Sequence, residues 1–395
     1  MKRFLCVVLT LVMALSLVAC GGGKKEETSS GGDKATTEST GGAEVIKIGV
    51  FEPMTGGNAS AGELEYEGMQ VANKARPTVT INGVEHPVEF VVADNKTDTV
   101  EAVTAAASLV SAGCVAAIGG SGSGLCIAAA PTFQEAKLPI VGTTCTNPLV
   151  TQDNDYYLRV CYTDVGQGDI LAKYATGVLG AKTAAILCDI TDTYCIGLAE
   201  YFKAGFGEEN IIEELHFNTG DQDFSAALTT INASGADVVF LGSQYTEGGL
   251  IAKQAEQLGF DMTFLGTDGW DTDVLLDIGG TALDGCAFVT FFDHTVSKSD
   301  AIDKYLADFQ EHTGGEPRSS YSSVGYDAYN IILDAIEKCN STDGETLLAA
   351  LYETEKDCVT GHITFDAEGD AVKDIAYLKS VKDGKWVSGG TADLK

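Results

Sequence analysis

The segment CVAAIGGSGSGLCIAAA, residues 114–130, decides the fold of this chain. It begins with a short apolar run, which is typical of a strand that is buried on both faces. A turn of glycine and serine follows at 119–124, and a helical pattern starts at Leu125. A strand, a tight turn and a helix in this order predict one unit of a parallel β-sheet with crossover helices.

The same alternation extends to both sides of this segment and predicts an α/β protein. In the first half we expect strands at 45–51, 88–93, 115–118, 139–141 and 157–160, with helices at 62–75, 99–111 and 125–136. A second series has helices at 165–178, 194–206, 223–233 and 246–258, and strands at 183–188, 211–217, 237–241 and 262–266. The last part has helices at 298–312, 322–338 and 344–353, and strands at 363–365 and 375–381.

Two such series predict two lobes, each a parallel sheet flanked by helices, joined by a hinge of about three crossovers. We place the N-terminal lobe at 45–163 and 292–374, and the C-terminal lobe at 164–291 and 375–395. Ligands of open parallel sheets bind beyond the carboxyl ends of the strands. Two such edges that face each other predict a cleft that closes by hinge motion around a small ligand.

The composition excludes some classes of partner. The chain is 45% apolar and 21% charged, which is typical of a globular protein large enough for two domains. Its formal net charge of −32 predicts repulsion from nucleic acid and from anionic lipid. An anionic ligand must therefore be held by local dipoles.

The N-terminus predicts export and anchoring. Lys2 and Arg3 precede an apolar run that is too short to span a bilayer, as in a secretory signal peptide. The sequence LVAC, residues 17–20, resembles the lipobox of bacterial lipoproteins, in which the cysteine is diacylated. We expect a signal peptide at 1–19 and a lipid on Cys20; the alternative is an ordinary cleaved signal. The domain then works outside the cytoplasm.

Residues 20–44 consist mainly of Gly, Ser, Thr, Lys and Glu, and cannot bury enough apolar surface to fold. We expect a disordered, lipid-anchored linker that holds the folded body away from the membrane. A spacer of this kind favours the outer face of a Gram-positive type of membrane over a Gram-negative periplasm.

The cysteines predict buried thiols. Of eleven cysteines, Cys6 lies in the signal peptide and Cys20 takes the lipid, so an odd number remains. No CxxC pair occurs, which argues against a zinc ribbon or a thioredoxin-type site. Most lie in apolar runs and are expected to act as small buried hydrophobes. Cys339 and Cys358 are the candidate pair for a disulfide.

The glycine turn at 119–124 is the first candidate for ligand binding. It joins a buried strand to a helix, so its backbone can wrap an anion at the positive end of that helix. It fits neither GxGxxG, nor a P-loop, nor GxSxG, so neither a nucleotide site nor a serine nucleophile is indicated. The alternative is a turn that serves packing alone.

Two further strand ends carry polar side chains. Thr143, Thr144 and Thr146 place three hydroxyls next to the glycine turn, where they can bind a carboxylate. Asp268 and Trp270 follow the strand at 262–266. A zwitterion requires an acidic group opposite a site that binds its carboxylate, and Asp268 can be this group. The alternative is that Asp268 is a helix N-cap.

Short motifs are spaced along residues 45–390 in a characteristic order. No single motif is specific, but together they resemble the extracytoplasmic substrate-binding proteins of branched-chain amino acid ABC importers, the leucine/isoleucine/valine-binding family. The motifs are Ile48-Gly49-Val50, Thr55-Gly56, Gly62, Gly68, Ile118-Gly119-Gly120-Ser121, Pro139-Ile140-Val141, Tyr194-Cys195-Ile196-Gly197, Asp223-Phe224, Gly266-Thr267-Asp268-Gly269, Thr360-Gly361, Phe365-Asp366 and Gly369.

The resemblance implies a type I periplasmic-binding-protein fold and a role for individual residues. Ser123 and Thr146 fall where the family binds the ligand carboxylate, and Thr144 where a backbone carbonyl accepts from the ligand ammonium. Tyr194 falls where a tyrosine lines the cleft, and Asp268 where an acidic residue pairs with the ammonium. Trp270 would then shape the side-chain pocket.

The chain departs from the family pattern in the side-chain pocket. Ala61 stands at a position that is often aromatic, and Gln244 at a tyrosine position, with Tyr245 one residue away. Branched-chain or aliphatic amino acids are the default ligand, and a polar or larger amino acid stays open.

The resemblance implies a monomeric receptor, not an enzyme, that takes up a free amino acid and delivers it to the permease of an ABC importer. None of the five histidines has metal-ligand spacing, and no cofactor is expected. The alternatives are the same fold with another small ligand, such as an amide or an aromatic acid, an extracytoplasmic α/β enzyme, or a sensor domain that feeds a kinase.

Overall fold

The computed structural model describes residues 43–394. The predicted signal peptide, Cys20 and nearly all of the linker at 20–44 lie outside the described residues.

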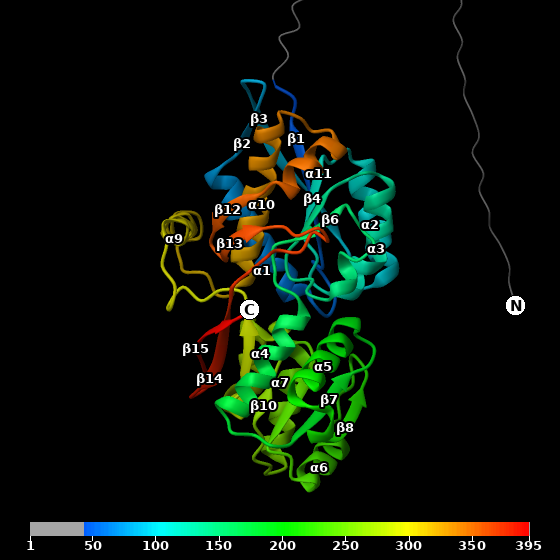
Figure 1. Ribbon diagram of the computed structural model, residues 1–395, viewed down its shortest axis with the longest axis vertical. Coiled ribbons are helices and arrows are strands. Elements are labelled where there is room, and N and C mark those ends of the chain that lie inside the picture. The colour runs from blue at the N-terminus through cyan, green and yellow to red at the C-terminus, as the bar shows by residue number, and fades with distance from the viewer. Residues whose placement is uncertain (1–42, 395) are drawn as a thin grey trace, which may run out of the picture. The chain divides into compact units, whose positions relative to one another are not determined.

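The first sheet has six strands in the order β2-β3-β1-β4-β5-β6 (Figure 1). All neighbours are parallel except β2 and β3, which form a hairpin. Alternate side chains of the central strand β1 enter different cores, Val50 one and Phe51 the other, because both faces of the sheet are covered. The strands are β1 Ile46–Glu52, β2 Thr78–Ile81, β3 Val84–Asp94, β4 Ala116–Ile118, β5 Ile140–Gly142 and β6 Tyr157–Arg159.

Two pairs of helices cover this sheet. The helices α2 (Thr99–Ser111) and α3 (Ser123–Glu135) share one core with Phe51, and α1 (Ala59–Ala75) and α10 (Tyr321–Cys339) share the other with Val50. The helix α1 lies so close to α10 that a Cβ on Gly68 would come within 1.8 Å of the Ser322 carbonyl oxygen. Glycine is therefore required at this crossing.

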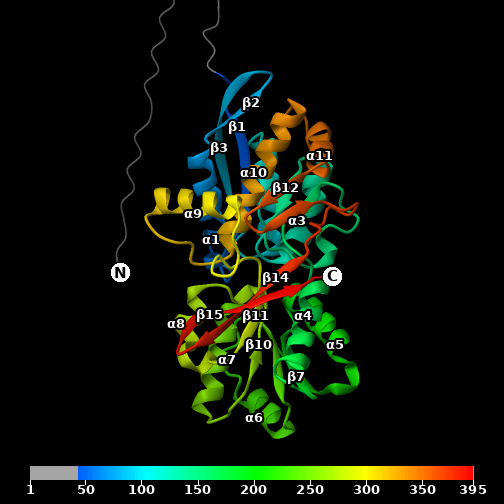
Figure 2. The same ribbon diagram turned by 60° about the vertical axis from the view of Figure 1, so that its left-hand side comes forward.

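The second sheet has seven strands in the order β15-β14-β11-β10-β9-β7-β8. The strands from β11 to β8 run parallel, and β14 and β15 form an antiparallel hairpin at the β11 edge, drawn in red in Figure 2. The strands are β7 Ala184–Asp189, β8 Ile211–Phe217, β9 Val238–Gly242, β10 Phe264–Leu265, β11 Ala287–Thr290, β14 Ile375–Lys382 and β15 Lys385–Asp393.

The remaining elements are helices beside the second sheet and a small late group. The helix α4 packs against α5, and α7 against α6 and α8. These helices are α4 Asp164–Gly177, α5 Thr193–Phe206, α6 Ser225–Ser234, α7 Tyr245–Gln257 and α8 Asp273–Gly279, with single turns η2 Glu208–Asn210, η3 Asp268–Trp270 and η4 Gly280–Leu283. A further single turn, η1 Pro148–Val150, packs against α3 beside the first sheet. The late group is α9 Asp300–Thr313, α11 Gly344–Tyr352, and the hairpin β12 Glu355–Cys358 and β13 Gly361–Thr364.

The chain passes between the two sheets three times, after β6, after β11 and after β13. The predicted α/β class, with two mostly parallel sheets flanked by helices, is confirmed. The prediction missed five helices and strands: β2, α8, β11, β12 and β15. The strand predicted at 262–266 is longer than the observed β10, which has only two residues.

The predicted disulfide between Cys339 and Cys358 is wrong for this structure. Both thiols are free, as are the other cysteines of the described residues. The Cys339 thiol donates to the carbonyl oxygens of Ile336 and Ser341 at the end of α10, while Cys358 is buried at the end of β12. Most of the nine thiols are buried, as predicted.

Candidate functional site

The glycine turn 119–124 has a conformation that requires glycine. Gly119, Gly120 and Gly122 have φ angles of 129°, 121° and 97°, which L side chains rarely adopt. A Cβ on Gly120 would also lie 2.2 Å from the Cys126 sulfur. The turn ends at Ser123, the buried first residue of α3, whose Oγ accepts a hydrogen bond of 3.2 Å from the Asn147 N–H.

The turn binds an anion that belongs to the chain itself. The Glu52 carboxyl group, at the end of β1, accepts from the N–H groups of Gly120 and Ser121 at 3.2 and 3.1 Å. These two N–H groups are therefore not available to a ligand, and the prediction that the turn binds a ligand anion is wrong for them. The glycine turn can still offer a ligand the Ser123 hydroxyl. It can also offer the N–H groups at the start of α3, which have no partner within the helix.

The loop after β5 also uses two of its three predicted hydroxyls internally. The Thr143 hydroxyl donates to Glu65 Oε2, and Thr144 Oγ1 donates to Glu65 Oε1 at 2.7 Å. The predicted carboxylate contact by all three threonines is thus wrong for these two side chains. Thr146 differs, because its Oγ1 is buried and has no hydrogen-bond partner within residues 43–394.

The second sheet places a buried carboxylate at its own edge. Asp268 follows β10 and is 2% exposed. It accepts a hydrogen bond from the hydroxyl of Tyr194, the second residue of α5. Gln167 Nε2 donates to the same hydroxyl at 3.3 Å. Asp268 is not the N-cap considered above, since Thr267 holds that position before η3 and Thr272 before α8.

Asp268 has no cation beside it. No Lys, Arg or His of residues 43–394 lies within 4.0 Å of its carboxylate. Burial raises the pKa of Asp268 to about 7, because a charge in a dry environment has lost its hydration. A ligand that supplies a positive charge would restore the ionised form.

Three residues of the crossover after β6 were missed by the sequence reasoning. Tyr162, Asp164 and Gln167 are buried, and each has side-chain oxygen atoms without a hydrogen-bond partner in the described part of the chain. Burial raises the pKa of Asp164 well above its usual value. The signal for them was available, because they follow the carboxyl end of a parallel strand, where ligands bind.

These unsatisfied groups belong to the same region as Thr146 and Asp268. The Asp164 N–H donates to the Thr146 carbonyl oxygen at 3.0 Å, and Gln167 reaches the hydroxyl that holds Asp268. Buried polar groups in native proteins are normally paired. A cluster of unpaired ones, together with a carboxylate that lacks a cation, indicates a site for a polar small molecule.

The three other predicted residues lie around this region. Gln244 donates to Asp192 Oδ2 at 2.8 Å, and Tyr245 donates to the Gly57 carbonyl oxygen at 2.6 Å, so that Tyr245 joins α7 to the start of α1. Trp270 is fully buried, and its Nε1 donates to the carbonyl oxygen and hydroxyl of Ser243.

A cavity of about 490 Å³ opens beside the site and is lined from both lobes. Its lining residues Gly122, Gly124 and Thr193 are sequence neighbours of Ser123 and Tyr194, which we group with Thr146 and Asp268 as the ligand clamp. Most of its exposed wall consists of apolar atoms, although the residues that line it are mainly of polar types or glycine and include two acids: Gly57, Asn58, Thr97, Thr99, Gly122, Gly124, Leu125, Thr191, Asp192, Thr193, Thr219, Gly220, Gln244, Thr246 and Glu247.

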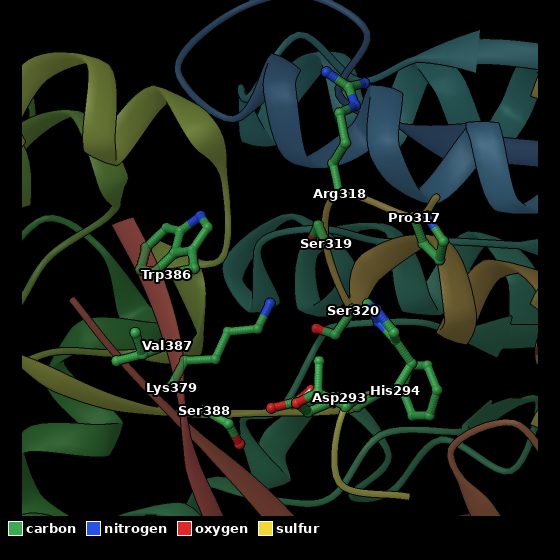
Figure 3. Close-up of a pocket in the computed structure, with 12 residues that line it drawn as sticks. Asp293, His294, Pro317, Arg318, Ser319, Ser320, Lys379, Trp386, Val387 and Ser388 are labelled. Carbon is green, nitrogen blue, oxygen red and sulfur yellow. Dashed lines mark hydrogen bonds between the residues drawn. The ribbon is translucent and has the colours of Figure 1, made fainter. Parts of the chain in front are cut away.

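A second pocket, of about 220 Å³, lies where the β14–β15 hairpin meets the loop before α10 (Figure 3). Lys379 extends from β14 toward Ser320 and forms an ion pair of 2.5 Å with Asp271, which also accepts from the Ser320 N–H at 2.9 Å. This buried network joins the Asp268 segment to α10. It belongs to the connection between the lobes.

Neither a cluster of metal-ligating side chains nor a membrane-spanning helix is found in the described residues. Within 43–394 no group of three or more His, Cys, Asp or Glu side chains could hold a metal ion. In the same range, no helix combines the length and the apolar character needed to cross a bilayer.

Comparisons with known proteins agree with this architecture. Residues 45–385 match the family model described as "Periplasmic binding protein". The Leu/Ile/Val-binding protein BraC3 of Rhizobium johnstonii is 30% identical, over 87% of this chain and 93% of its own. Among solved structures, the leucine-binding protein LivK of Thermotoga maritima is 35% identical with a TM-score of 0.83, over 88% of this chain and 99% of its own.

A third relative is known with its ligand. The branched-chain amino acid transporter substrate-binding protein LivJ of Streptococcus pneumoniae, in complex with isoleucine, is 26% identical with a TM-score of 0.80, over 89% of this chain and 99% of its own. The chain belongs to the periplasmic binding protein family, whose members are extracytoplasmic solute receptors of ABC transporters and not enzymes.

Proposed function

We propose that this chain is a lipid-anchored receptor that binds a free α-amino acid, branched-chain or aliphatic by default, between its lobes and delivers it to an ABC importer. The names of the relatives support the ligand class. The observation that carries the proposal is the buried Asp268 carboxylate, which faces hydroxyl groups and no cation among the described residues.

Each end of the zwitterion has a matching group. The ligand carboxylate is bound by the hydroxyls of Ser123 and Thr146 and by N–H groups at the start of α3, where the helix dipole favours negative charge. The ligand ammonium is bound by Asp268, by the Tyr194 hydroxyl and by the Thr144 carbonyl oxygen. Charge-assisted hydrogen bonds in a site without water supply most of the affinity.

The side-chain pocket is where the ligand is selected. Gln244, Tyr245 and Trp270 are its residues on the second-lobe side, and the Trp270 indole is fully buried against Ser243. The cavity of about 490 Å³, with Asp192, Gln244 and Glu247 in its lining, supports testing polar and larger amino acids beside leucine.

The remaining parts of the proposal concern the whole chain. We propose a monomer with the N-terminal lobe at 45–163 and 292–374 and the C-terminal lobe at 164–291 and 375–395. The signal peptide at 1–19, the lipid on Cys20 and the linker at 20–44 would hold it on the outer face of a Gram-positive type of membrane.

A thermal-shift screen tests the ligand assignment, because a ligand that binds only the folded state raises the melting temperature. The panel contains the natural amino acids, leucinamide, which lacks the carboxylate, and 4-methylpentanoate, which lacks the ammonium. We expect one or a few amino acids to stabilise the chain and both analogues to fail. Stabilisation by 4-methylpentanoate alone, or by benzoate added to the panel as an aromatic acid, would favour the alternative of an organic-acid receptor.

A further inference from the structure

Two buried carboxyl groups lie directly behind the proposed ligand clamp. Glu52 ends β1 and Glu65 lies on α1, and both side chains are fully inaccessible to solvent. Glu52 accepts from the N–H groups of Gly120 and Ser121, and Glu65 accepts from the hydroxyls of Thr143 and Thr144.

A single hydroxyl connects the two carboxyl groups. The Thr143 hydroxyl binds Glu65 Oε2 and also lies 3.5 Å from Glu52 Oε1, and it has only one proton to donate. No Lys, Arg or His within residues 43–394 comes within 4.0 Å of either carboxyl group. Two neighbouring negative charges in a dry interior, without a cation, are strongly unfavourable. At least one carboxyl group must therefore keep a proton.

The two carboxyl groups hold the two loops that carry the first-lobe half of the clamp. Glu52 fixes Ser121, two residues before Ser123, and Glu65 fixes Thr144, two residues before Thr146. We propose that Glu52 and Glu65 share one proton in the ligand-binding state, and that this singly protonated pair positions both loops, so that loss of the proton weakens ligand binding. The inference rests on the proposed function and adds its regulation by pH.

Electrostatics agree with this geometry. Burial, together with the neighbouring charge of Glu65, raises the pKa of Glu52 well above its usual value, and burial raises the pKa of Glu65 to about 7. The pair titrates as a unit, so its last proton leaves in one step shared by both groups.

The other titratable groups facing the pair are two thiols and two phenols. Burial raises the pKa of Cys126, Tyr157 and Tyr321, so these three stay neutral near pH 7. Burial opposes ionisation of the Cys145 thiol too, but hydrogen bonds with the Cys126 and Cys161 thiols lower its pKa. A negative Cys145 would add to the repulsion at Glu65, so it needs its own control.

The expected pH dependence has a definite sign. On the alkaline side of neutrality, once the pair has lost its last proton, the two charges repel each other and the loops separate, so affinity falls. Asp268 acts in the opposite direction, because it must be ionised to bind an ammonium group. The chain should thus bind best near pH 7, and the pair governs only the alkaline side.

The variant Glu65→Gln tests the proposal. Glutamine is neutral at every pH and its carbonyl oxygen can still accept from Thr144. With L-leucine as the probe, we expect Kd of the parent chain to rise roughly tenfold from pH 7 to pH 8.5, and Kd of the variant to change by less than about twofold. At pH 8.5, where Asp268 is already ionised, calorimetry in two buffers of different ionisation enthalpy should also show proton uptake on binding by the parent and not by the variant. The same alkaline slope in both proteins would overturn the proposal.

Controls separate the pair from its surroundings. Glu63→Gln removes an exposed charge from the same helix, and Cys145→Ala removes the neighbouring thiol; both should keep the alkaline slope. Glu52→Gln provides a second test, with the same flat profile expected.

Melting temperatures without ligand separate this proposal from the ligand assignment. Because the pKa values of Glu52 and Glu65 are raised in the folded state, the parent chain loses stability as pH rises through about 7. The Glu65→Gln variant does not lose the contribution of Glu65. The difference in melting temperature between variant and parent should therefore grow from pH 6 to pH 8.5. A growing difference without leucine binding supports the shared proton and counts against leucine as ligand; a constant difference overturns the shared proton.

Discussion

At the scale of single residues, the decisive feature is a charge without a counter-charge. Asp268 is 2% exposed and interacts with the hydroxyl of Tyr194, while the other buried carboxylate of its segment, Asp271, has Lys379 as its partner. A buried carboxylate without a cation destabilises the fold, so its presence indicates a role in binding.

Replacing Asp268 by Asn tests this role with almost no change in shape. The ligand ammonium would lose its charged partner, and we expect affinity to fall on the order of 100-fold, or about 3 kcal/mol. Isothermal titration calorimetry measures the loss. Asp273→Asn, which changes an exposed residue of α8, is the matched control and should leave Kd unchanged. Equal Kd values for the parent and the Asp268 variant would contradict the assignment.

The raised pKa of Asp268 predicts that ligand affinity falls when the pH is lowered below 7. Below pH 7 the carboxyl group is increasingly protonated and cannot pair with an ammonium group, so affinity should fall from pH 7 to pH 5.5 by roughly tenfold. In the ligand-free chain the sign is reversed, because a raised pKa favours the folded state at low pH and this contribution is lost as pH rises through about 7. Binding measured across this range should show this loss of affinity in the parent and not in Asp268→Asn.

Sequence reasoning located part of the site at this scale. Strand ends pointed to Thr146 and Asp268, and the resemblance added Ser123 and Tyr194, whose binding roles stay predictions. Glu52 and Glu65 were missed, because nothing in their own segments shows that a carboxyl group meets N–H groups and hydroxyls 68 to 91 residues away.

At the scale of elements, the helix α1 matters because it connects the core to the site. It carries Glu65 on the side that packs against α10, and a Cβ on Gly325 would come within 2.3 Å of the Glu65 carbonyl oxygen. Gly68 makes the same kind of contact one turn later. The two glycines let α1 and α10 approach closely, and this contact fixes the position of Glu65 relative to α10.

Gly68→Ala should disturb this contact strongly. Because the new Cβ would overlap the backbone of Ser322, the helices must separate, at a cost of about 1–3 kcal/mol. Thermal or urea denaturation measures the loss. Gly177→Ala is the control, since this α4 glycine has no neighbouring atoms within 4 Å and a Cβ there should be tolerated. A melting temperature equal to that of the parent would show that α1 and α10 adjust without strain.

Most elements could be predicted because apolar runs and helical spacing mark them clearly; α2 and β8 have the predicted bounds. The missed strands β2, β12 and β15 carry mainly polar or half-exposed side chains, so their pairing depends on neighbours and not on local pattern. The strand β11 is a four-residue buried run, too short to be told from a loop.

At the scale of the whole molecule, hydrogen bonds hold the two lobes together around the cleft. Asn147 Nδ2 donates to the Thr193 carbonyl oxygen at 3.3 Å, and the Tyr245 hydroxyl binds Gly57 and also accepts from the Ser60 N–H at 3.3 Å. The sequence predicted Tyr245 as a ligand contact. Its hydroxyl connects α7 with α1, a contact between residues 185 to 188 positions apart, and its contact with a ligand stays a prediction.

Tyr245→Phe should weaken this connection and keep the ring. Each lost hydrogen bond costs about 0.5–1.5 kcal/mol, so the closed form becomes less favoured and ligand should dissociate roughly three- to tenfold faster. Stopped-flow measurement of dissociation checks this. Tyr201→Phe, on the half-exposed side of α5, is the control and should leave the rate unchanged. An unchanged rate in Tyr245→Phe would remove this residue from lobe closure.

The position of Trp270 also gives the chain a built-in optical sensor. The chain has two tryptophans, and this one lies two residues after Asp268 with its indole held against Ser243, whereas Trp386 lies on the β15 hairpin. In a Trp386→Phe background, all indole fluorescence would come from Trp270, two residues from the proposed ligand contact Asp268. Uptake of a solute could then be followed in real time by emission intensity, without any attached dye.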